Sequence, residues 1–107
     1  MPSIGRLRHR LTLEAPQETP DGAGGVTRNW SALAQIWAAL EPLGGGDGVV
    51  ADKRVAQLTH RVVIRKRGDV SLNHRLRLGA RSFTIRSIRD AAEDGRFLEC
   101  LVEEERP

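Results

Sequence analysis

The chain has 107 residues, of which 39% are hydrophobic, and its formal net charge is +3. This length fits a single domain spanning residues 1–107. The apolar runs fall well short of the roughly 20 residues that cross a membrane, so we expect a soluble protein with no membrane partner. The single cysteine, Cys100, excludes an intrachain disulfide and a cysteine metal cluster, and we expect it in the core. The amino terminus lacks the apolar stretch of a signal peptide, which predicts cytoplasmic synthesis.

Apolar and polar residues alternate along most of the chain, a pattern that is typical of half-buried β-strands. The segment Leu7–Ala15 has this pattern and predicts a first strand. The prolines and glycines of residues 16–25 predict a turn or loop. The segment Val26–Leu40 fits either an amphipathic helix or a strand, and we favour a strand in its second half. Trp37 lies in that half, and we expect its side chain to be buried.

Residues 43–57, "LGGGDGVVADKRVAQ", are the least regular part of the chain. Its glycines disfavour a stable element because ordering each one costs extra backbone entropy, although residues 49–57 could form a short helix. A glycine loop after a strand is a weak phosphate-binding signal. Here it lacks both the Gly-Lys-Ser/Thr sequence of a P-loop and a parallel strand–helix–strand context. The segment therefore fits either a flexible surface loop or a loop that acts within an assembly.

The strand pattern returns in the second half of the chain. Residues 59–67 predict a third strand, and residues 74–90 predict a hairpin with a Gly-Ala-Arg turn. A shift of the apolar phase between Ile85 and Ile88 predicts a β-bulge in the hairpin. Residues 97–104 predict the last strand. Short strands separated by turns predict an all-β fold, either a small antiparallel barrel or a sandwich.

Residues 61–89 are rich in arginine and poor in carboxylates. Such a basic face could meet nucleic acid or an acidic protein surface, or it could be a solvated strand face. The basic segment contains only one aromatic residue, Phe83, so it lacks the stacking platform of RNA-binding sheets. The histidines His9, His60 and His74 lack ligand spacing, and no Ser-His-Asp arrangement has an interpretable context. We therefore predict no enzyme activity, no metal and no cofactor.

Six segments occur in an order and spacing that are similar to one known family: "GRLRHRLTLEAP", "DGAGGVTRNW", "WAALEPLGGGDG", "THRVVIRKR", "RLRLGARSFTIRSIRD" and "LECLVEE". Over residues 4–104 the chain resembles the phage head-tail joining family, the small head-completion or stopper proteins of long-tailed bacteriophages and gene transfer agents. No single segment is specific, and the order carries the resemblance. The family often has a glutamate shortly after the glycine of its long loop, where this chain has Asp47 among extra glycines. The matching residues are Gly5, Leu7, Arg10, Asp21, Gly24, Gly25, Trp30, Trp37, Ala38, Thr59, Val62, Arg65, Phe83, Ile85, Ile88 and Asp90.

The resemblance implies a small antiparallel β-barrel with a long glycine-rich loop, residues 43–57, inserted between the second and third strands. It implies a structural connector that forms a homo-oligomeric ring between the portal or adaptor protein and the tail terminator or tail tube protein. Such a ring lies at the head-tail interface of the virion or phage-like particle, completes the head, and closes or lines the channel for packaged double-stranded DNA. The inserted loop would face this channel. The predicted channel-loop residues are Gly44, Gly45, Gly46, Asp47, Gly48, Asp52, Lys53 and Arg54.

The basic strands and the acidic carboxyl end have two interpretations in such a ring. They could line the channel near DNA, where contacts to phosphate are independent of base sequence. Alternatively, the acidic end of one subunit could meet arginines of the next in a heterologous contact that closes into a ring. We favour the subunit contact because strong adhesion to DNA would hinder passage of the genome. The predicted contact residues are Arg61, Arg65, Arg67, Arg75, Arg77, Glu103 and Glu104. The alternative function is a small basic β-barrel that binds nucleic acid.

Overall fold

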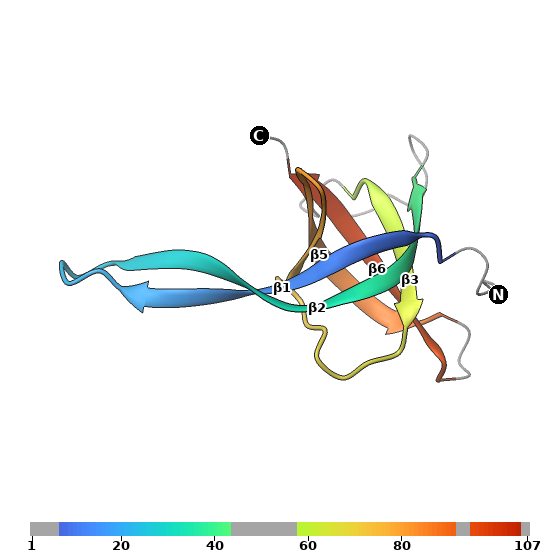
Figure 1. Ribbon diagram of the computed structural model, residues 1–107, viewed down its shortest axis with the longest axis horizontal. Helices are drawn as coiled ribbons and strands as arrows, with labels where there is room; N and C mark the ends of the chain where they lie inside the picture. Colours follow the sequence, from blue (N-terminus) through green and yellow to red (C-terminus); the bar gives the residue numbers. More distant parts are fainter. Residues whose placement is uncertain (1–6, 44–57, 92–94, 106–107) are drawn as a thin grey trace.

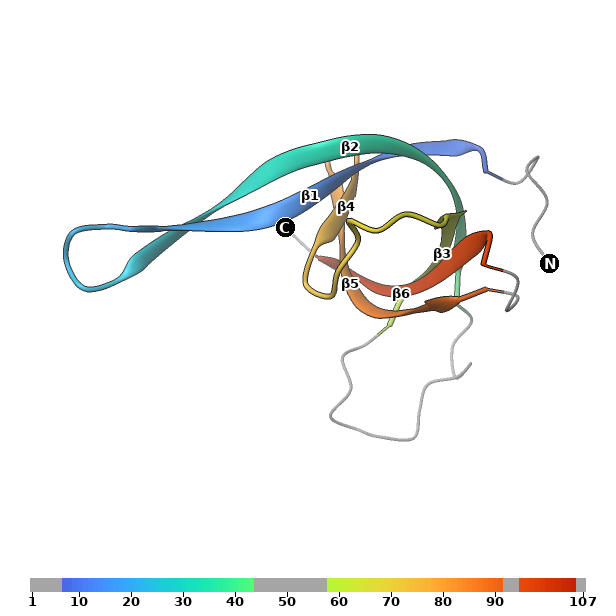
Figure 2. The same cartoon turned by 90° about the horizontal axis from the view of Figure 1, so that it is seen from below.

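The computed structural model describes residues 7–43, 58–91 and 95–105. These residues form antiparallel strands in the order β1-β2-β3-β6-β5-β4 (Figure 1). The pairing of β4 with β1 closes the strands into a barrel (Figure 2). The predicted all-β fold and its barrel architecture are therefore confirmed. None of the described residues belongs to a helix that is long and apolar enough to cross a membrane. The strands are β1 (His9–Pro20), β2 (Val26–Pro42), β3 (His60–Arg65), β4 (Arg75–Leu78), β5 (Arg81–Asp90) and β6 (Phe97–Glu105).

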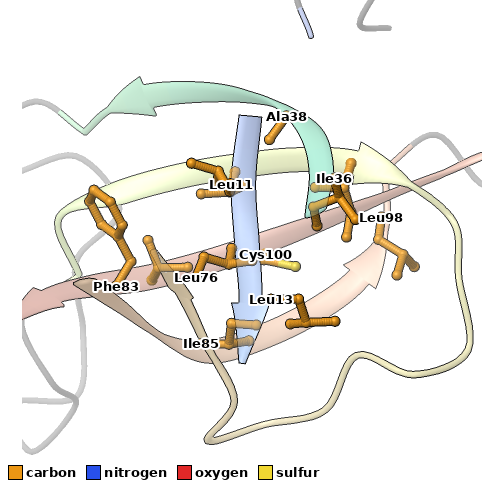
Figure 3. Packing of buried hydrophobic residues seen from close by; sticks show 12 residues of the cluster. Leu11, Leu13, Ile36, Ala38, Leu76, Phe83, Ile85, Leu98 and Cys100 are labelled. Atoms are coloured by element: carbon orange, nitrogen blue, oxygen red, sulfur yellow. The ribbon is translucent and has the colours of Figure 1, made fainter. Parts of the chain in front are cut away.

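One face of every strand fills the barrel interior (Figure 3). Successive side chains of a strand point to opposite faces, so within the barrel the core residues alternate with residues that point outward. Burying a large side chain such as Phe83 contributes roughly 1.5–3 kcal/mol. Side chains therefore fill the interior of this small barrel. The buried members of the core are Leu11, Leu13, Ile36, Ala38, Val62, Ile64, Leu76, Phe83, Ile85, Leu98, Cys100 and Val102.

A second, smaller apolar cluster covers part of the outer wall of the barrel. Val63 lies between two core residues of β3 and therefore points outward. There it packs with Ala39 of β2, Phe97 of β6 and Leu7, which precedes β1. Ala91, just after β5, packs against the same cluster. This cluster holds Leu7 against the barrel.

The outer halves of β1 and β2 form a hairpin that projects from the barrel, and we call this hairpin, residues 15–31, the arm (Figure 2). The predicted loop at residues 16–25 is wrong for residues 16–20, which continue β1. The segment Val26–Leu40 is strand throughout, and not only in its second half. Beyond Glu14, β1 pairs with β2 alone among the described residues, so it is an edge strand. Prolines are tolerated there because a missing N–H breaks no ladder.

A β-bulge marks the point where the arm leaves the barrel. Leu13 pairs with Ala34, whereas the next residue, Glu14, pairs with Ala32. Leu33 is therefore the extra residue on β2. Bulges bend the strand that carries them and increase its twist, which is consistent with the change of direction between barrel and arm in Figure 2.

The β4–β5 hairpin matches its prediction closely. Leu78 pairs with Arg81 across a two-residue turn, and Gly79 has a φ of 61° at the first turn position. A glycine with positive φ at this position is typical of the two-residue hairpin turns whose twist matches that of the flanking strands. The predicted bulge on β5 is confirmed by a register shift between Ile85 and Ser87.

The insertion between β2 and β3 leaves and re-enters the barrel at one point. The backbone N–H of Leu43 donates to the carbonyl of Thr59 at 2.9 Å, and the N–H of Thr59 donates to Val102 of β6 at 2.8 Å. The Thr59 hydroxyl also accepts a hydrogen bond from the N–H of Glu104 at 2.8 Å. The predicted channel loop and the predicted short helix fall within residues 44–57, outside the described residues.

Candidate interaction surfaces

Several of the predicted contact residues on the outer wall of the barrel are already paired within the chain. Arg61 of β3 lies between two carboxylates, with its Nε 2.9 Å from Glu99 of β6 and its Nη1 3.4 Å from Glu41 of β2. The Nε contact is an ion pair outside hydrogen-bond geometry. Glu99 also accepts a hydrogen bond from Arg89 of β5. These four side chains form a ladder of alternating charge across four adjacent strands.

Arg75 and Arg77 of β4 converge on one carboxylate, that of Glu14 on β1. Arg75 Nε donates a hydrogen bond to Glu14, and Arg77 Nη1 lies 3.6 Å from its other oxygen. The guanidinium of Arg75 also lies 4.2 Å from the ring centroid of Trp30 in the arm, a cation–π contact. This cluster ties the base of the arm to the seam where the barrel closes.

Glu103 and Glu104 of β6 are bonded to arginines of the neighbouring strand β5. Arg86 Nη2 donates to Glu103 at 3.0 Å. Arg81 donates two hydrogen bonds to the Glu104 carboxylate, from Nε at 2.9 Å and from Nη2 at 3.2 Å. The prediction that these carboxylates meet arginines of another subunit stays a prediction, and such a contact would require these pairs to exchange partners.

The last two predicted contact residues lie at the end of β3, where Arg65 is the final residue of the strand and Arg67 follows it. Arg67 pairs with Asp69, with Nε 2.6 Å from Oδ1, and this hydrogen bond lowers the pKa of Asp69. Arg65 instead faces an aromatic ring, with its guanidinium 5.9 Å from the centroid of Phe97. Within the described residues, Arg65 is the one predicted contact residue without a charged partner.

The arm and the outer wall of β4 and β5 enclose a cleft of about 830 Å³, which the sequence did not reveal. Arg28 enters it from the arm and is paired with Glu18 at 3.0 Å. The strand-forming sequence "VTRNW" at residues 26–30 was the signal for an arm, but the prolines and glycines before it favoured a loop. The lining residues are Pro16, Arg28, Trp30, Asn73, Arg75, Ala80, Ser82, Thr84, Arg86 and Glu105.

The arm ends in a turn that is closed by Asp21. The backbone N–H groups of Ala23 and Gly25 donate to Asp21 Oδ1 at 2.8 and 3.1 Å. These hydrogen bonds lower the pKa of the carboxyl group because they stabilise its ionised form. The two glycines at Gly22 and Gly24 have φ values of 83° and 89°, in the region that glycine adopts without strain.

The prediction that Trp37 is buried is wrong, because its side chain is 55% exposed on the outer wall of β2. Its neighbours Ile36 and Ala38 enter the core, so strand alternation turns Trp37 outward. Arg10, its pairing partner on β1, holds its guanidinium 5.7 Å from the ring centroid. The size of the tryptophan side chain favoured a core position, but the alternation of side chains along β2 turns Trp37 outward.

Two further titratable groups are partly or fully buried. Burial raises the pKa of the Cys100 thiol to about 12, with a smaller contribution from Glu99. His60 packs edge-on against Phe83 with ring centroids 5.1 Å apart, and burial lowers its pKa, although nearby Glu104 opposes the shift. No group of three metal-ligating side chains lies together in the described part of the chain. The described surface carries intrachain ion pairs, stacked rings and a projecting arm.

A family model for the phage head completion protein matches residues 2–105 of the chain. The solution structure of protein SF1141 from Shigella flexneri 2a is similar, with a TM-score of 0.74 and 25% identity over 96% of each chain. A chain of the virion of a native gene transfer agent particle has a TM-score of 0.67 and 26% identity, covering 92% of this chain and 94% of that chain. No match was found among the curated proteins. Because the family model spans nearly the whole sequence, the protein belongs to the phage head completion family and is a structural, head-completing component of a phage or phage-like particle.

Proposed function

We propose that the protein forms a homo-oligomeric ring between the portal or adaptor protein and the tail terminator or tail tube protein. Packaged double-stranded DNA would cross the particle neck through the centre of this ring. Family membership supports the role in head completion, and the similarity to a chain of a gene transfer agent virion supports a place in such particles. The observation that carries ring formation is the arm, residues 15–31.

The arm has little within its own chain to stabilise it. Beyond Pro16 and Trp30 both strands are exposed. A two-stranded hairpin alone is marginally stable in water. The ion pair between Glu18 and Arg28 is exposed, and such pairs contribute about 0–1 kcal/mol. A neighbouring subunit that covers the arm would supply the missing apolar contacts, which include the exposed Val26.

The two edges of the arm differ in what they can bind. The β1 edge carries Pro16 and Pro20, which have no N–H to donate. On the other side, β3 pairs only with residues 38–42 of β2, so the described edge of residues 26–35 is unpaired and contains no proline. An unpaired edge is a template for another strand. Contact between the arm of one copy and the barrel of the next is heterologous and closes into a ring when the rotation permits.

The ion-paired part of the outer wall, around Arg61 and Arg75, suits a channel through which DNA passes without adhering. Arg61 and Arg75 are each neutralised by a carboxylate of the same chain. Tight, salt-sensitive DNA binding comes from basic side chains that neutralise phosphates, and paired arginines are poorly available for this. We propose that residues 43–57 face the channel from the rim of the barrel, where Leu43 and Thr59 hold the two ends of the insertion together.

An arm-truncated variant tests ring formation directly. Replacing residues 17–29 with Asn-Gly would connect the paired residues Pro16 and Trp30 through a tight turn. We expect the truncated protein to keep its circular dichroism spectrum and cooperative unfolding, because the core lies outside the arm. In cells that produce particles, we expect it to be missing from purified particle necks, with heads that fail to join tails.

A point variant at the tip, Ala23→Ser, leaves both strands of the arm in place and serves as the matched control. It is expected to enter particles as the wild type does. Cryo-electron microscopy of the wild-type neck would show whether the arm contacts a neighbouring copy. Normal assembly of the truncated variant, or a single copy of the protein in the neck, would contradict the proposed ring.

A further inference from the structure

Arg10, Trp37 and Arg65 lie next to one another on the outer wall of the barrel, on β1, β2 and β3, and we call them the Arg–Trp strip. Arg10 and Trp37 are pairing partners, with the guanidinium stacked against the ring. The pairing of Ala38 with Ile64 places Trp37 next in register to Arg65. All three side chains are exposed. The strip therefore presents a large aromatic ring between two guanidinium groups.

The positive charges of the strip are not compensated within residues 7–43, 58–91 and 95–105. There, neither Arg10 nor Arg65 has a carboxylate within ion-pair distance, and each stacks on an aromatic ring instead. This contrasts with Arg61, four residues before Arg65 on the same strand, which lies between two carboxylates. Charge complementarity therefore favours a negatively charged partner for this part of the wall.

The strip also has the composition of an interface centre. Trp37 points away from the core, so its exposed ring is not needed to fill the barrel. Tryptophan and arginine are the residue types most enriched among the side chains that dominate binding energy at protein interfaces. The strip borders the outer apolar cluster through Ala39, two residues after Trp37, and through Phe97, on which Arg65 stacks.

We propose that the Arg–Trp strip docks an acidic segment of another protein of the particle. Carboxylates of that segment would pair with Arg10 and Arg65, and an apolar side chain would pack on Trp37. The protein's own acidic end is a poor occupant because Glu103 and Glu104 already bind Arg86 and Arg81. The docking needs only a second particle protein, so it stands independently of ring formation.

Duplex DNA fits the strip less well than an acidic protein segment does. Base stacking on aromatic side chains requires single strands, and a duplex hides the faces of its bases. The affinity of a protein for duplex DNA rises with the number of phosphates that it neutralises. The two uncompensated guanidinium groups of the strip would therefore give weak binding that depends strongly on salt.

Footprinting and cross-linking in assembled particles test the proposal without any assumption about the partner's sequence. We expect hydroxyl radicals to oxidise Trp37 in the isolated protein and to spare it in particles, relative to the exposed reference residue Leu72. A photo-cross-linking amino acid at position 65 is expected to capture a different particle protein at an acidic segment, identified by mass spectrometry. Equal oxidation of Trp37 in both states, or cross-links only to a second copy or to DNA, would overturn the proposal.

Peptide binding supplies a second measurement with matched variants. The probe is a short synthetic peptide of alternating glutamate and leucine. Its binding is measured through the fluorescence of Trp37, in a Trp30→Phe background that removes the other tryptophan. We expect the double variant Arg10→Gln/Arg65→Gln to weaken binding at least about tenfold. The control Arg86→Gln/Arg89→Gln removes the same charge from paired arginines and is expected to change the affinity less than about twofold. Equal weakening in both double variants, or no saturable binding, would overturn the proposal.

Discussion

Glu14 and Arg75 face each other across the seam where β1 and β4 close the barrel, and Arg75 donates a hydrogen bond to the Glu14 carboxylate. The Glu14 side chain is 9% exposed and that of Arg75 is 20% exposed. Removing one partner of such a pair leaves the desolvated charge of the other uncompensated. The seam therefore depends on both members of the pair.

The substitution Glu14→Ala is expected to lower the free energy of unfolding by about 2–4 kcal/mol, because it leaves the partly buried Arg75 guanidinium without its carboxylate partner. Urea denaturation followed by circular dichroism measures the loss. The control is Glu18→Ala, which breaks the exposed pair with Arg28 and is expected to cost at most about 1 kcal/mol. Similar losses for the two variants would show that the seam pair is no stronger than a surface pair.

Trp37→Ala is expected to change the unfolding free energy by less than about 1 kcal/mol, because the ring lies outside the core. Phe83→Ala, at a side chain that is fully buried, is expected to cost about 3–5 kcal/mol. The two variants remove aromatic rings of comparable size from opposite faces of the barrel wall. Comparable destabilisation of both in thermal or urea unfolding would place Trp37 in the core after all.

His60 is expected to make the fold less stable as the pH falls. Burial lowers its pKa in the folded state below 6.5, so the unfolded chain takes up a proton more readily. The stability contributed by neutral His60 is complete above about pH 7 and declines as the pH falls through about 6.5. Melting temperatures at about pH 7.5 and about pH 5.5 measure the decline. The decline is expected to be smaller in His60→Gln, and an unchanged decline in this variant would refute this account.

Cys100 is expected to be unreactive in the folded protein, because burial holds its thiol pKa at about 12 and the thiolate is the nucleophile. Alkylation by iodoacetamide at about pH 8 is therefore expected to proceed only through unfolded molecules. Mass spectrometry after timed labelling measures the rate. It is expected to rise with urea in parallel with unfolding, and rapid labelling of the folded protein would contradict the packing around Cys100.

Deleting Gly44–Gly48 is expected to leave the melting temperature of the isolated protein close to that of the wild type. Loop length changes closure entropy only slowly, and the hydrogen bond between Leu43 and Thr59 closes the base of the insertion. In particles, the deletion is expected to impair head completion or the retention of packaged DNA. If particles of the deletion variant keep their DNA and remain infectious or transducing, the insertion has no role in the channel.

Strand periodicity in the second half of the sequence predicted most of the fold there. Residues such as Leu76, Phe83 and Ile85 alternate with polar neighbours, and each occupies the core as the pattern requires. Even the bulge near Ile85 was visible, because an extra residue shifts the apolar phase. These elements were predictable because burial of one face decides both their type and their register.

The arm and the pairing of its charges were not predictable in the same way. Pro16 and Pro20 favour a loop unless the strand is known to lie at an edge, which is a property of the whole sheet. Likewise, the sequence alone shows Arg61 as a basic residue with no partner, and only the strand register places Glu41 and Glu99 beside it. The local sequence pattern predicts which side chains are buried. It does not predict contacts between strands that are distant in the sequence, because these depend on closure of the barrel.

The hydrogen bond between Leu43 and Thr59 means that the barrel is complete without the segment that joins these residues. The segment can therefore change in length or sequence while the six strands that the described residues form stay the same. The same site is expected to accept an epitope tag or a fluorescent label, which would report on incorporation of the protein into particles without any redesign of the fold.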